Sequence, residues 1–178
     1  MLHNEEDAWA RSIGALESLT GEVIWMDNKE INDALNDLIQ TCIDSAQGFT
    51  EAANNVKSPE LHSLFTKIAD DRSGFAGELK REVLAIGGDP ETSGSAGAAV
   101  HRAWMGIVGT LTGKNDHSIL AEAERGEDSA VSAYKKALAE PMPSSVRNLV
   151  DRQFRIVIET HDRIKQMRDA KTTATGRR

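Results

Sequence analysis

Residues 58–90 read SPELHSLFTKIADDRSGFAGELKREVLAIGGDP, and this stretch predicts one complete amphipathic helix. Ser58 is a favoured N-cap, Pro59 suits the first helical position, and the Gly87-Gly88 pair with the following Asp-Pro is a strong stop signal. Apolar residues recur at spacings of three and four, which is the period of a helix with one buried face. They are Leu61, Phe65, Ile68, Phe75, Leu79, Val83 and Ile86. One central position on this face is charged, because Arg72 occupies it.

Three further segments have the same apolar periodicity, so the sequence predicts four long helices in all. The segment that precedes residues 58–90 is predicted to begin at Asp27, with Glu30 completing a capping box. The remaining two are predicted to begin near Asn115 and near Ser144. We therefore expect an all-α fold.

The two ends of the chain are predicted to lie outside this helical domain. We expect residues 26–170 to form the bundle and residues 171–178 to be a disordered tail, because the tail is polar throughout. Residues 1–25 are an N-terminal extension with two interpretations. They form a short extra helix, on the bundle surface or for binding a partner, or they are a variable segment upstream of a domain that starts at Met26.

The connections between helices predict how the helices are arranged. Short turns at residues 57–59 and 140–143 make each flanking pair of helices an antiparallel hairpin. Residues 87–114 are a longer link with a short amphipathic helix, and about 16 helical residues at ~1.5 Å each span ~24 Å, most of the length of a bundle. Two hairpins joined by one long crossover form the ferritin-like arrangement of a four-helix bundle.

Short motifs along the chain support this expectation, because their order and spacing resemble those of an uncharacterised bacterial family. That family consists of ferritin-like four-helix-bundle proteins with a domain of unknown function, and the resemblance covers roughly residues 26–169. It implies the fold and no reaction, since no activity is established for the family. The motifs are Asn36-Asp37-Leu38-Ile39, Gly48-Phe49, Pro59-Glu60-Leu61, Gly87-Gly88, His101-Arg102-Ala103-Trp104, Glu124-Arg125-Gly126-Glu127 and His161-Asp162-Arg163-Ile164.

Composition excludes several classes of partner. The formal net charge of -7 argues against binding to nucleic acid or to an acidic membrane surface, which both need clustered Lys and Arg. No apolar run approaches the ~20 residues of a membrane-spanning helix. Cys42 is the sole cysteine, so an internal disulfide framework is excluded. We expect a cytoplasmic protein that forms homo-oligomers, with any other protein partner undefined.

Polar residues on the apolar faces are the candidate functional residues. Arg72, Glu127 and Gln153 fall on these faces at similar depth along the bundle, so we expect them to share one layer. Because a buried charge is costly unless it is paired, Arg72 requires a carboxylate, and Glu127 suits its planar guanidinium. The favoured interpretation is a structural polar layer. The alternatives are a layer that lines a small-ligand or ion cavity, and an error in the assumed helix phase.

A di-metal centre of the ferritin type is not expected from these helices. Such a centre needs a Glu from each of two helices and a Glu-x-x-His pair from each of the others. The second helix presents Arg72 where a ligand is required. On the first helix every central acid is predicted to point away from the core, and these acids are Asp33, Asp37, Asp44 and Glu51.

A reduced metal site remains as an alternative, with Glu124, Glu127 and His161 as its main candidate ligands, Asp71 as an alternative to Glu127, and iron, manganese or zinc as the ion. The competing interpretation is a hydrogen bond between His161 and Glu124 inside the bundle. His101, on the predicted crossover helix, has no acid at helical spacing, so we interpret it as a packing or hydrogen-bonding residue.

No motif of an enzyme is present: there is no nucleophile elbow, no phosphate-binding loop and no dinucleotide fingerprint. We therefore favour a non-enzymatic structural or protein-interaction role with no cofactor, and the alternative is a metal-binding or redox-active bundle.

Gly48, Gly74 and Gly126 interrupt predicted helices, and we expect them to permit close approach of the crossover helix or, alternatively, a dimer contact.

Overall fold

The computed structural model describes residues 6–92 and 115–175, with side chains described for residues 29–92 and 115–170. Within these ranges the chain forms helices and no strand. The helices are α1 (Glu6–Asn55), α2 (Pro59–Ala85), α4 (Asp116–Ala139) and α5 (Ser144–Thr175). The predicted all-α fold of four long helices is confirmed.

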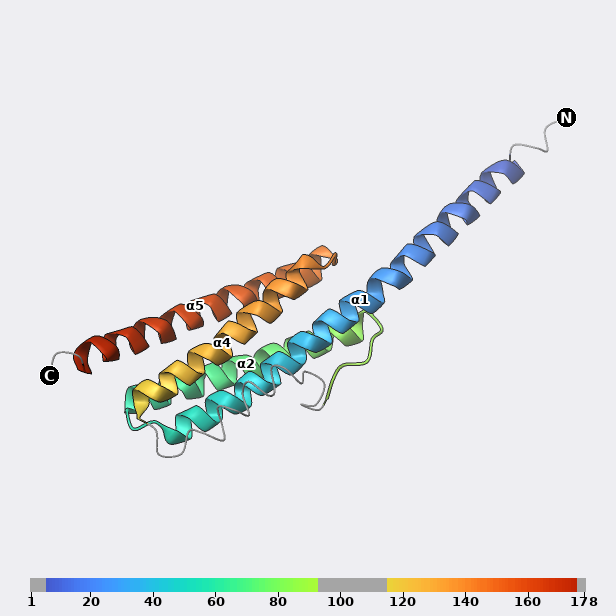
Figure 1. Ribbon diagram of the computed structural model, residues 1–178. Helices are drawn as coiled ribbons and strands as arrows, with labels where there is room; N and C mark the ends of the chain where they lie inside the picture. Colours follow the sequence, from blue (N-terminus) through green and yellow to red (C-terminus); the bar gives the residue numbers. More distant parts are fainter. Residues whose placement is uncertain (1–5, 93–114, 176–178) are drawn as a thin grey trace.

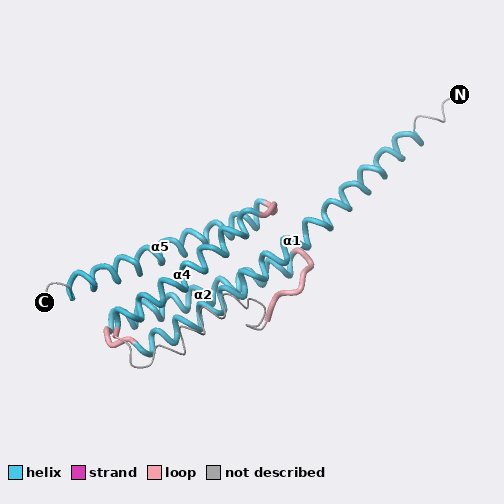
Figure 2. The backbone as a smooth tube through the Cα atoms, in the orientation of Figure 1, coloured by secondary structure: helices cyan, strands magenta, loops and turns pink. Residues whose placement is uncertain are grey.

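Two antiparallel hairpins, α1 with α2 and α4 with α5, lie side by side, and α4 packs against both α1 and α5 (Figures 1 and 2). α2 ends at the opposite end of the bundle from the start of α4, and residues 93–114 belong to the link between the two helices. The predicted crossover helix and His101 lie in that link, outside the described residues. None of the described helices combines the length and the apolar character needed to cross a membrane.

Two predicted helix ends differ from the structure. α1 begins at Glu6 and continues through Asp27, where the sequence predicts its start. Residues 22–27 contain no glycine or proline to interrupt the helix, and a capping residue is tolerated inside a helix at a cost below ~1 kcal/mol. The N-terminal part of α1 therefore projects beyond the ends of α2 and α4 (Figure 1). α5 continues to Thr175, directly before Gly176, and so extends into the segment that the sequence assigns to the C-terminal tail.

The ends of α2 and the start of α4 follow the sequence signals. The Ser58 side chain accepts a hydrogen bond from the Leu61 backbone N–H at 3.4 Å, and that of Asn115 accepts one from Ser118 N at 2.9 Å. At the end of α2, Gly87 adopts a positive φ of 77°, a conformation that glycine adopts without a steric penalty. Gly88 N–H then donates to Val83 O at 2.9 Å and closes the helix.

The loop after α2 is fixed to α1. Asn36 Nδ2 donates to Asp89 O at 3.0 Å, and its Oδ1 accepts a hydrogen bond from Glu91 N at 2.8 Å. Gly88 lies so close to α1 that an added Cβ would meet Asn32 Oδ1 at 2.2 Å. A larger residue at Gly88 would therefore need the Asn32 side chain to move. The two Asn36 hydrogen bonds give a physical role to one residue of the Asn36-Asp37 motif.

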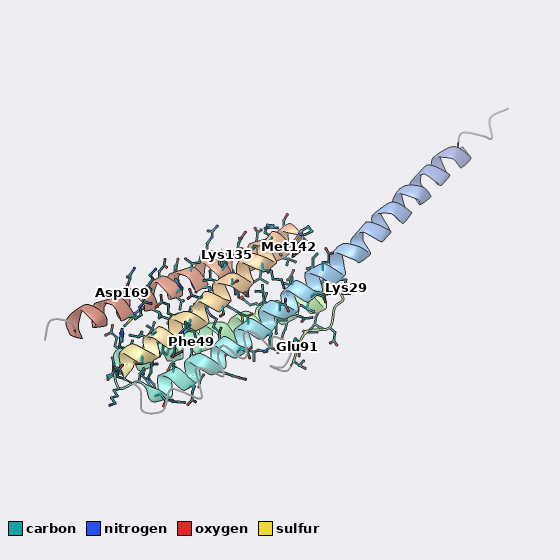
Figure 3. The ribbon with its side chains drawn as sticks, viewed as in Figure 1. Lys29, Phe49, Glu91, Lys135, Met142 and Asp169 are labelled. Atoms are coloured by element: carbon teal, nitrogen blue, oxygen red, sulfur yellow. The ribbon has the colours of Figure 1, made fainter. Side chains whose placement is uncertain are left out.

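The core consists of two apolar clusters, one toward each end of the bundle. Figure 3 shows side chains from both clusters. Met142, at the α4–α5 turn, packs beside the first cluster, and Phe49 belongs to the second. The first cluster includes Ile31, Leu35, Phe75, Leu79, Tyr134 and Val150, and the second includes Phe49, Phe65, Ile68, Leu120 and Ile164. Complete burial of such a side chain contributes about 1.5–3 kcal/mol. Arg72 and Glu127 lie along α2 and α4 between residues of the two clusters, so they divide the apolar core.

Candidate functional site

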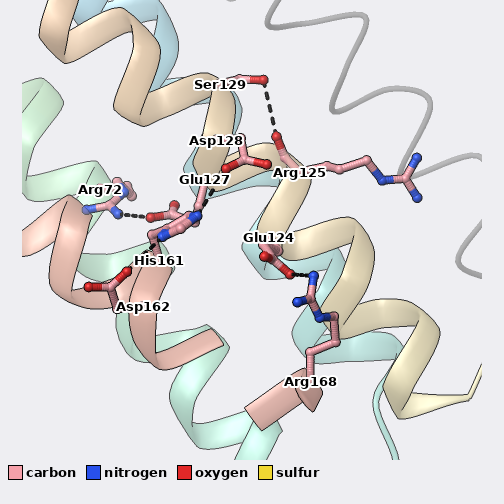
Figure 4. Close-up of polar contacts among 9 residues, drawn as sticks. All are labelled: Arg72, Glu124, Arg125, Glu127, Asp128, Ser129, His161, Asp162 and Arg168. Carbon is pink, nitrogen blue, oxygen red and sulfur yellow. Dashed lines mark hydrogen bonds and ion pairs between the residues drawn. The ribbon is translucent and has the colours of Figure 1, made fainter. Parts of the chain in front are cut away.

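A buried ion pair joins α2 to α4 in the middle of the bundle (Figure 4). Arg72 Nη2 donates to Glu127 Oε2 at 2.8 Å, and the two side chains are 1% and 0% exposed. The guanidinium also lies over the Phe75 ring, 5.4 Å from its centroid, which favours the cation. Removing ions of this size from water costs several kcal/mol each, and mutual attraction offsets that cost only while the pair is intact. Each charge therefore depends on the other.

The pair is not saturated with hydrogen bonds. Arg72 Nε and Nη1 and Glu127 Oε1 are buried and have no hydrogen-bond partner within the described part of the chain. Burial raises the pKa of Glu127, whereas the charge and hydrogen bond of Arg72 oppose that rise. The contact is thus a single hydrogen bond between charged groups, with unused hydrogen-bonding capacity on both sides.

Gln153 on α5 belongs to a second hydrogen-bonded group. Its side chain is fully buried and connects three helices. Oε1 accepts a hydrogen bond from the Tyr134 hydroxyl at 2.8 Å, while Nε2 donates to Glu78 Oε2 at 2.8 Å and to Phe75 O at 3.4 Å. No hydrogen bond between Gln153 and the Arg72–Glu127 pair occurs among the described contacts.

The chain of hydrogen bonds continues inward to Cys42 on α1. Because Tyr134 donates its hydroxyl hydrogen to Gln153, the Cys42 thiol has to donate to the Tyr134 oxygen, 3.3 Å away. Burial raises the pKa of Cys42 to about 11 and the pKa of Tyr134 well above its usual value. Both groups are therefore neutral donors at physiological pH. The hydrogen bonds all run in one direction, from Cys42 through Tyr134 and Gln153 to the carboxylate of Glu78. Arg152 pairs with that carboxylate at 3.1 Å.

Glu124, one helical turn before Glu127 on α4, forms a different ion pair. Its Oε2 accepts a hydrogen bond from Arg168 Nη1 on α5 (Figure 4), and the side chains are 10% and 29% exposed. Arg168 also donates to Asp169 Oδ1 at 2.7 Å. Glu124 is thus held by a cation at the edge of the bundle.

His161 lies between two carboxylates rather than beside Glu124. Its Nε2 is 3.0 Å from Asp128 Oδ1 on α4, and its Nδ1 is 3.1 Å from Asp162 Oδ1 on α5 (Figure 4). The His161 side chain is 18% exposed, and both aspartates are largely exposed. The hydrogen bond expected between His161 and Glu124 is therefore wrong. Residue spacing along a helix gives the depth of His161 in the bundle but not the direction in which its ring turns.

The three candidate metal ligands have separate partners in this structure. Glu127 pairs with Arg72, Glu124 with Arg168, and His161 with two aspartates. Across residues 29–92 and 115–170 no group of three or more His, Cys, Asp or Glu side chains is gathered so that it could hold a metal ion. The guanidinium against Glu127 does not fit a carboxylate-bridged di-metal centre, which needs that oxygen as a ligand.

A buried polar stripe on α1 escaped the sequence prediction. Asp44 was expected to point into solvent, yet it is 1% exposed, and Gln40, Thr41 and Ser45 are buried beside it. The Gln40 amide and the Ser45 hydroxyl have no hydrogen-bond partner within the described residues. The only signal in the sequence is that these polar residues recur at spacings of one and four, which places them on one helix face.

Comparison with known proteins identifies the fold. No curated protein matches the chain. The bacterioferritin-related protein from Bacteroides fragilis, described as a dodecameric thioferritin, matches with a TM-score of 0.69 and 12% identity over 90% of this chain and 97% of its own. The DPS protein from Vibrio cholerae O1, described as a member of a broad superfamily of ferritin-like diiron-carboxylate proteins, matches with a TM-score of 0.65 and 15% identity over 80% of this chain and 91% of its own.

At these identities the two structures show the fold and nothing about chemistry. They confirm the ferritin-like arrangement that the connection lengths predict. The sequence itself matches a family over residues 30–140, a range that contains the Arg72–Glu127 pair and most of the motifs named above. The chain belongs to this family, which is described as Domain of unknown function (DUF2383).

Proposed function

We propose that this protein is a structural, self-associating helical bundle without catalytic activity, in which Arg72, Glu127 and Gln153 form a polar layer that fixes the helix arrangement. The observation that carries the proposal is the buried contact between Arg72 Nη2 and Glu127 Oε2 at 2.8 Å. Such a pair adds little net stability, but a shift of either helix by one turn would leave two buried charges unpaired. The layer thus selects one register, as single buried polar residues do in coiled coils.

Self-association is supported by the fold and by one of the related structures. The Bacteroides fragilis protein is described as dodecameric, and this chain covers 97% of it. Closed, symmetric homo-oligomers are also the commonest assemblies of soluble proteins. We place the protein in the cytoplasm, because its sole cysteine is a buried free thiol and its composition is acidic.

A second candidate is a bundle that binds iron, manganese or zinc through Glu127, His161 and Glu124. Glu127 Oε1 favours it, because this carboxylate oxygen is buried and accepts no hydrogen bond from the described residues. The contacts of the His161 ring with aspartates also resemble the carboxylate–histidine pairs that orient metal ligands. Binding would require Glu124 to leave Arg168 and His161 to give up one aspartate.

Elemental analysis of the full chain, purified without chelator, separates the two candidates. We expect an oligomer by light scattering, with no stoichiometric metal in wild type or in His161→Ala. His62→Ala is the matched control, since His62 is an exposed histidine on α2. Stoichiometric iron, manganese or zinc that is lost in His161→Ala and kept in His62→Ala would overturn the structural proposal in favour of the metal-binding one.

A further inference from the structure

The outer face of α2, opposite the core, carries a regular stripe of residues. Its members follow one another at spacings of 3, 4, 3, 4 and 3, so they lie along one side of the helix. They are Lys67, Asp70, Gly74, Gly77, Arg81 and Leu84. All except Gly77 are exposed, and Gly77 is partly so. Leu84, at 61% exposure, is the one exposed large hydrophobic residue among the described side chains. We refer to these six residues as the α2 stripe.

The α2 stripe is complementary to itself when its direction is reversed. Two antiparallel helices related by a two-fold axis place residues at equal distances from the axis opposite each other. With the axis between residues 75 and 76, Gly74 faces Gly77 of the partner subunit. Asp70 precedes Gly74 by four residues and Arg81 follows Gly77 by four, so the axis sets Asp70 opposite the partner subunit's Arg81. The acid thus meets a base twice in one dimer.

The ends of the α2 stripe match in the same way. Lys67 precedes Asp70 by three residues, and Leu84 follows Arg81 by three, so each Lys67 lies opposite the partner subunit's Leu84. A lysine covers apolar surface with its aliphatic stem while its ammonium group stays in water. The contact would therefore cover the exposed leucine of each subunit.

The two glycines point to close approach of a second helix. A mid-helix glycine destabilises a helix relative to alanine, so it needs a reason. Within the described part of the chain, a Cβ at Gly74 would meet nothing within 4 Å, and one at Gly77 would meet only Arg81 Nη1 at 3.8 Å, an ordinary contact. The described residues therefore leave room for a larger side chain at both positions. A helix backbone packed against them from outside would not leave that room.

Charge gives the same indication. Asp70 and Arg81 are exposed, and neither has an ion pair or hydrogen bond within the described residues. Most other charges along α2 are already used inside the chain: Lys67 pairs with Asp71, and Glu78 pairs with Arg152. Among the charged residues of the α2 stripe, Asp70 and Arg81 are the two without a partner within the described residues, and the two-fold arrangement brings them together.

We propose that α2 packs antiparallel against α2 of a second copy of this chain, about a two-fold axis between residues 75 and 76. The proposal rests on the self-association proposed above and identifies the surface responsible. A second copy is the partner because the α2 stripe complements itself in glycine, charge and apolar contact, a property that an unrelated partner would not require.

A charge exchange at Asp70 and Arg81 tests the arrangement. Asp70→Arg and Arg81→Asp each set like charges opposite one another twice in the dimer. We expect either variant to raise the dimer dissociation constant about tenfold. The double variant restores both pairs with their signs reversed, so its dissociation constant should return to near the wild-type value. Glu159→Arg, the same change at an exposed position on α5, is the control. Sedimentation velocity of the full chain over a concentration series measures the dissociation constants of the wild type and of the four variants.

The outcomes separate this surface from self-association in general. A wild-type chain that is monomeric at every concentration would overturn both proposals. A wild-type oligomer that neither single variant weakens, or that the double variant weakens more than each single one, would overturn the α2 surface alone.

A glycine variant provides an independent check on the same dimer. Gly74→Ala with Gly77→Ala should raise the melting temperature of the dilute monomer, because alanine favours the helix and its Cβ has room. The same variant should weaken the dimer several-fold. A variant that strengthens the helix and leaves the dimer dissociation constant unchanged would contradict close packing at this face.

Discussion

Two glutamates one turn apart on α4 form ion pairs in very different surroundings. Glu127 pairs with Arg72 between the two apolar clusters, where the side chains are 0% and 1% exposed. Glu124 pairs with Arg168 at the edge of the bundle, where they are 10% and 29% exposed. Both contacts join charged atoms of the same kinds. We therefore expect access to solvent, rather than the contact itself, to determine the free-energy cost of breaking each pair.

The same contrast bears on function. The inner pair has no water to replace a lost partner, so it constrains the helices strongly. Arg168 and the two aspartates beside His161 reach solvent, so their ion pairs can exchange partners with water and ions at a lower cost. A ligand would therefore reach Glu124 and His161 more easily than the Arg72–Glu127 pair. Substitutions in the two regions test how different these regions are.

The largest effect is expected from breaking the inner pair. Arg72→Leu should lower the free energy of unfolding by about 3–5 kcal/mol, because Glu127 is left buried without its cation. Arg72→Leu combined with Glu127→Leu should cost less than Arg72→Leu alone. Urea denaturation of the two single variants and the double variant completes the cycle, and strictly additive losses would mean that the two charges are not coupled.

A pH effect of about 2–3 kcal/mol is expected from the buried thiol near the inner pair. Burial raises the pKa of Cys42 from 9.0 to about 11, so the folded state favours the neutral thiol. That stabilisation is complete below pH 9.0 and is lost as the pH rises to about 11. Cys42→Ser should show a smaller loss of stability over this range, whereas Tyr134 titrates in both proteins.

Urea denaturation at a series of alkaline pH values measures the difference. Parallel pH profiles for wild type and Cys42→Ser would contradict a thiol that the folded state keeps neutral.

An intermediate effect is expected at Gln153. Gln153→Leu leaves the buried Tyr134 hydroxyl without its acceptor, so the free energy of unfolding should fall by about 1–3 kcal/mol. Gln166→Leu, at an exposed position on the same helix, is the matched control and should change stability by less than about 0.5 kcal/mol. Equal effects of the two substitutions in thermal denaturation would show that the Tyr134–Gln153 hydrogen bond does not contribute to stability.

The smallest effect is expected at the outer pair. Arg168→Ala should cost about 0.2–1 kcal/mol, and the cost should shrink between ~0.1 M and ~1 M salt because salt screens the partly exposed Arg168 charge. The cost of Arg72→Leu should hardly depend on salt, because its pair is buried. An Arg168→Ala effect that is as large and as salt-independent as that of Arg72→Leu would show that the two regions are alike.

Helical periodicity accounts for the parts of the structure that could be predicted. The Ser58 cap, the Gly87 stop and the four helices follow from local backbone preferences. The contact between Arg72 and Glu127 follows from the apolar faces of two helices and from equal depth along the bundle. In each case the information lies within one helix or in the length of one turn.

The remaining features depend on side-chain directions or on segments distant in sequence. His161 contacts Asp128 because of how its ring turns, which residue spacing does not encode. Asp44 is buried although it lies off the apolar face, and no pattern within α1 indicates what excludes water there. The start of α1 differs because a capping motif does not stop a helix that nothing upstream interrupts.

The direction of the hydrogen bonds from Cys42 to Glu78 has a spectroscopic consequence. Cys42 is the sole cysteine, and its S–H group donates to the Tyr134 oxygen. The infrared S–H stretch of this protein is therefore a single band, and it shifts to lower frequency while the donor is engaged. Because the donor belongs to α1 and the acceptor to α4, that band reports, without any added label, whether the two hairpins remain in contact.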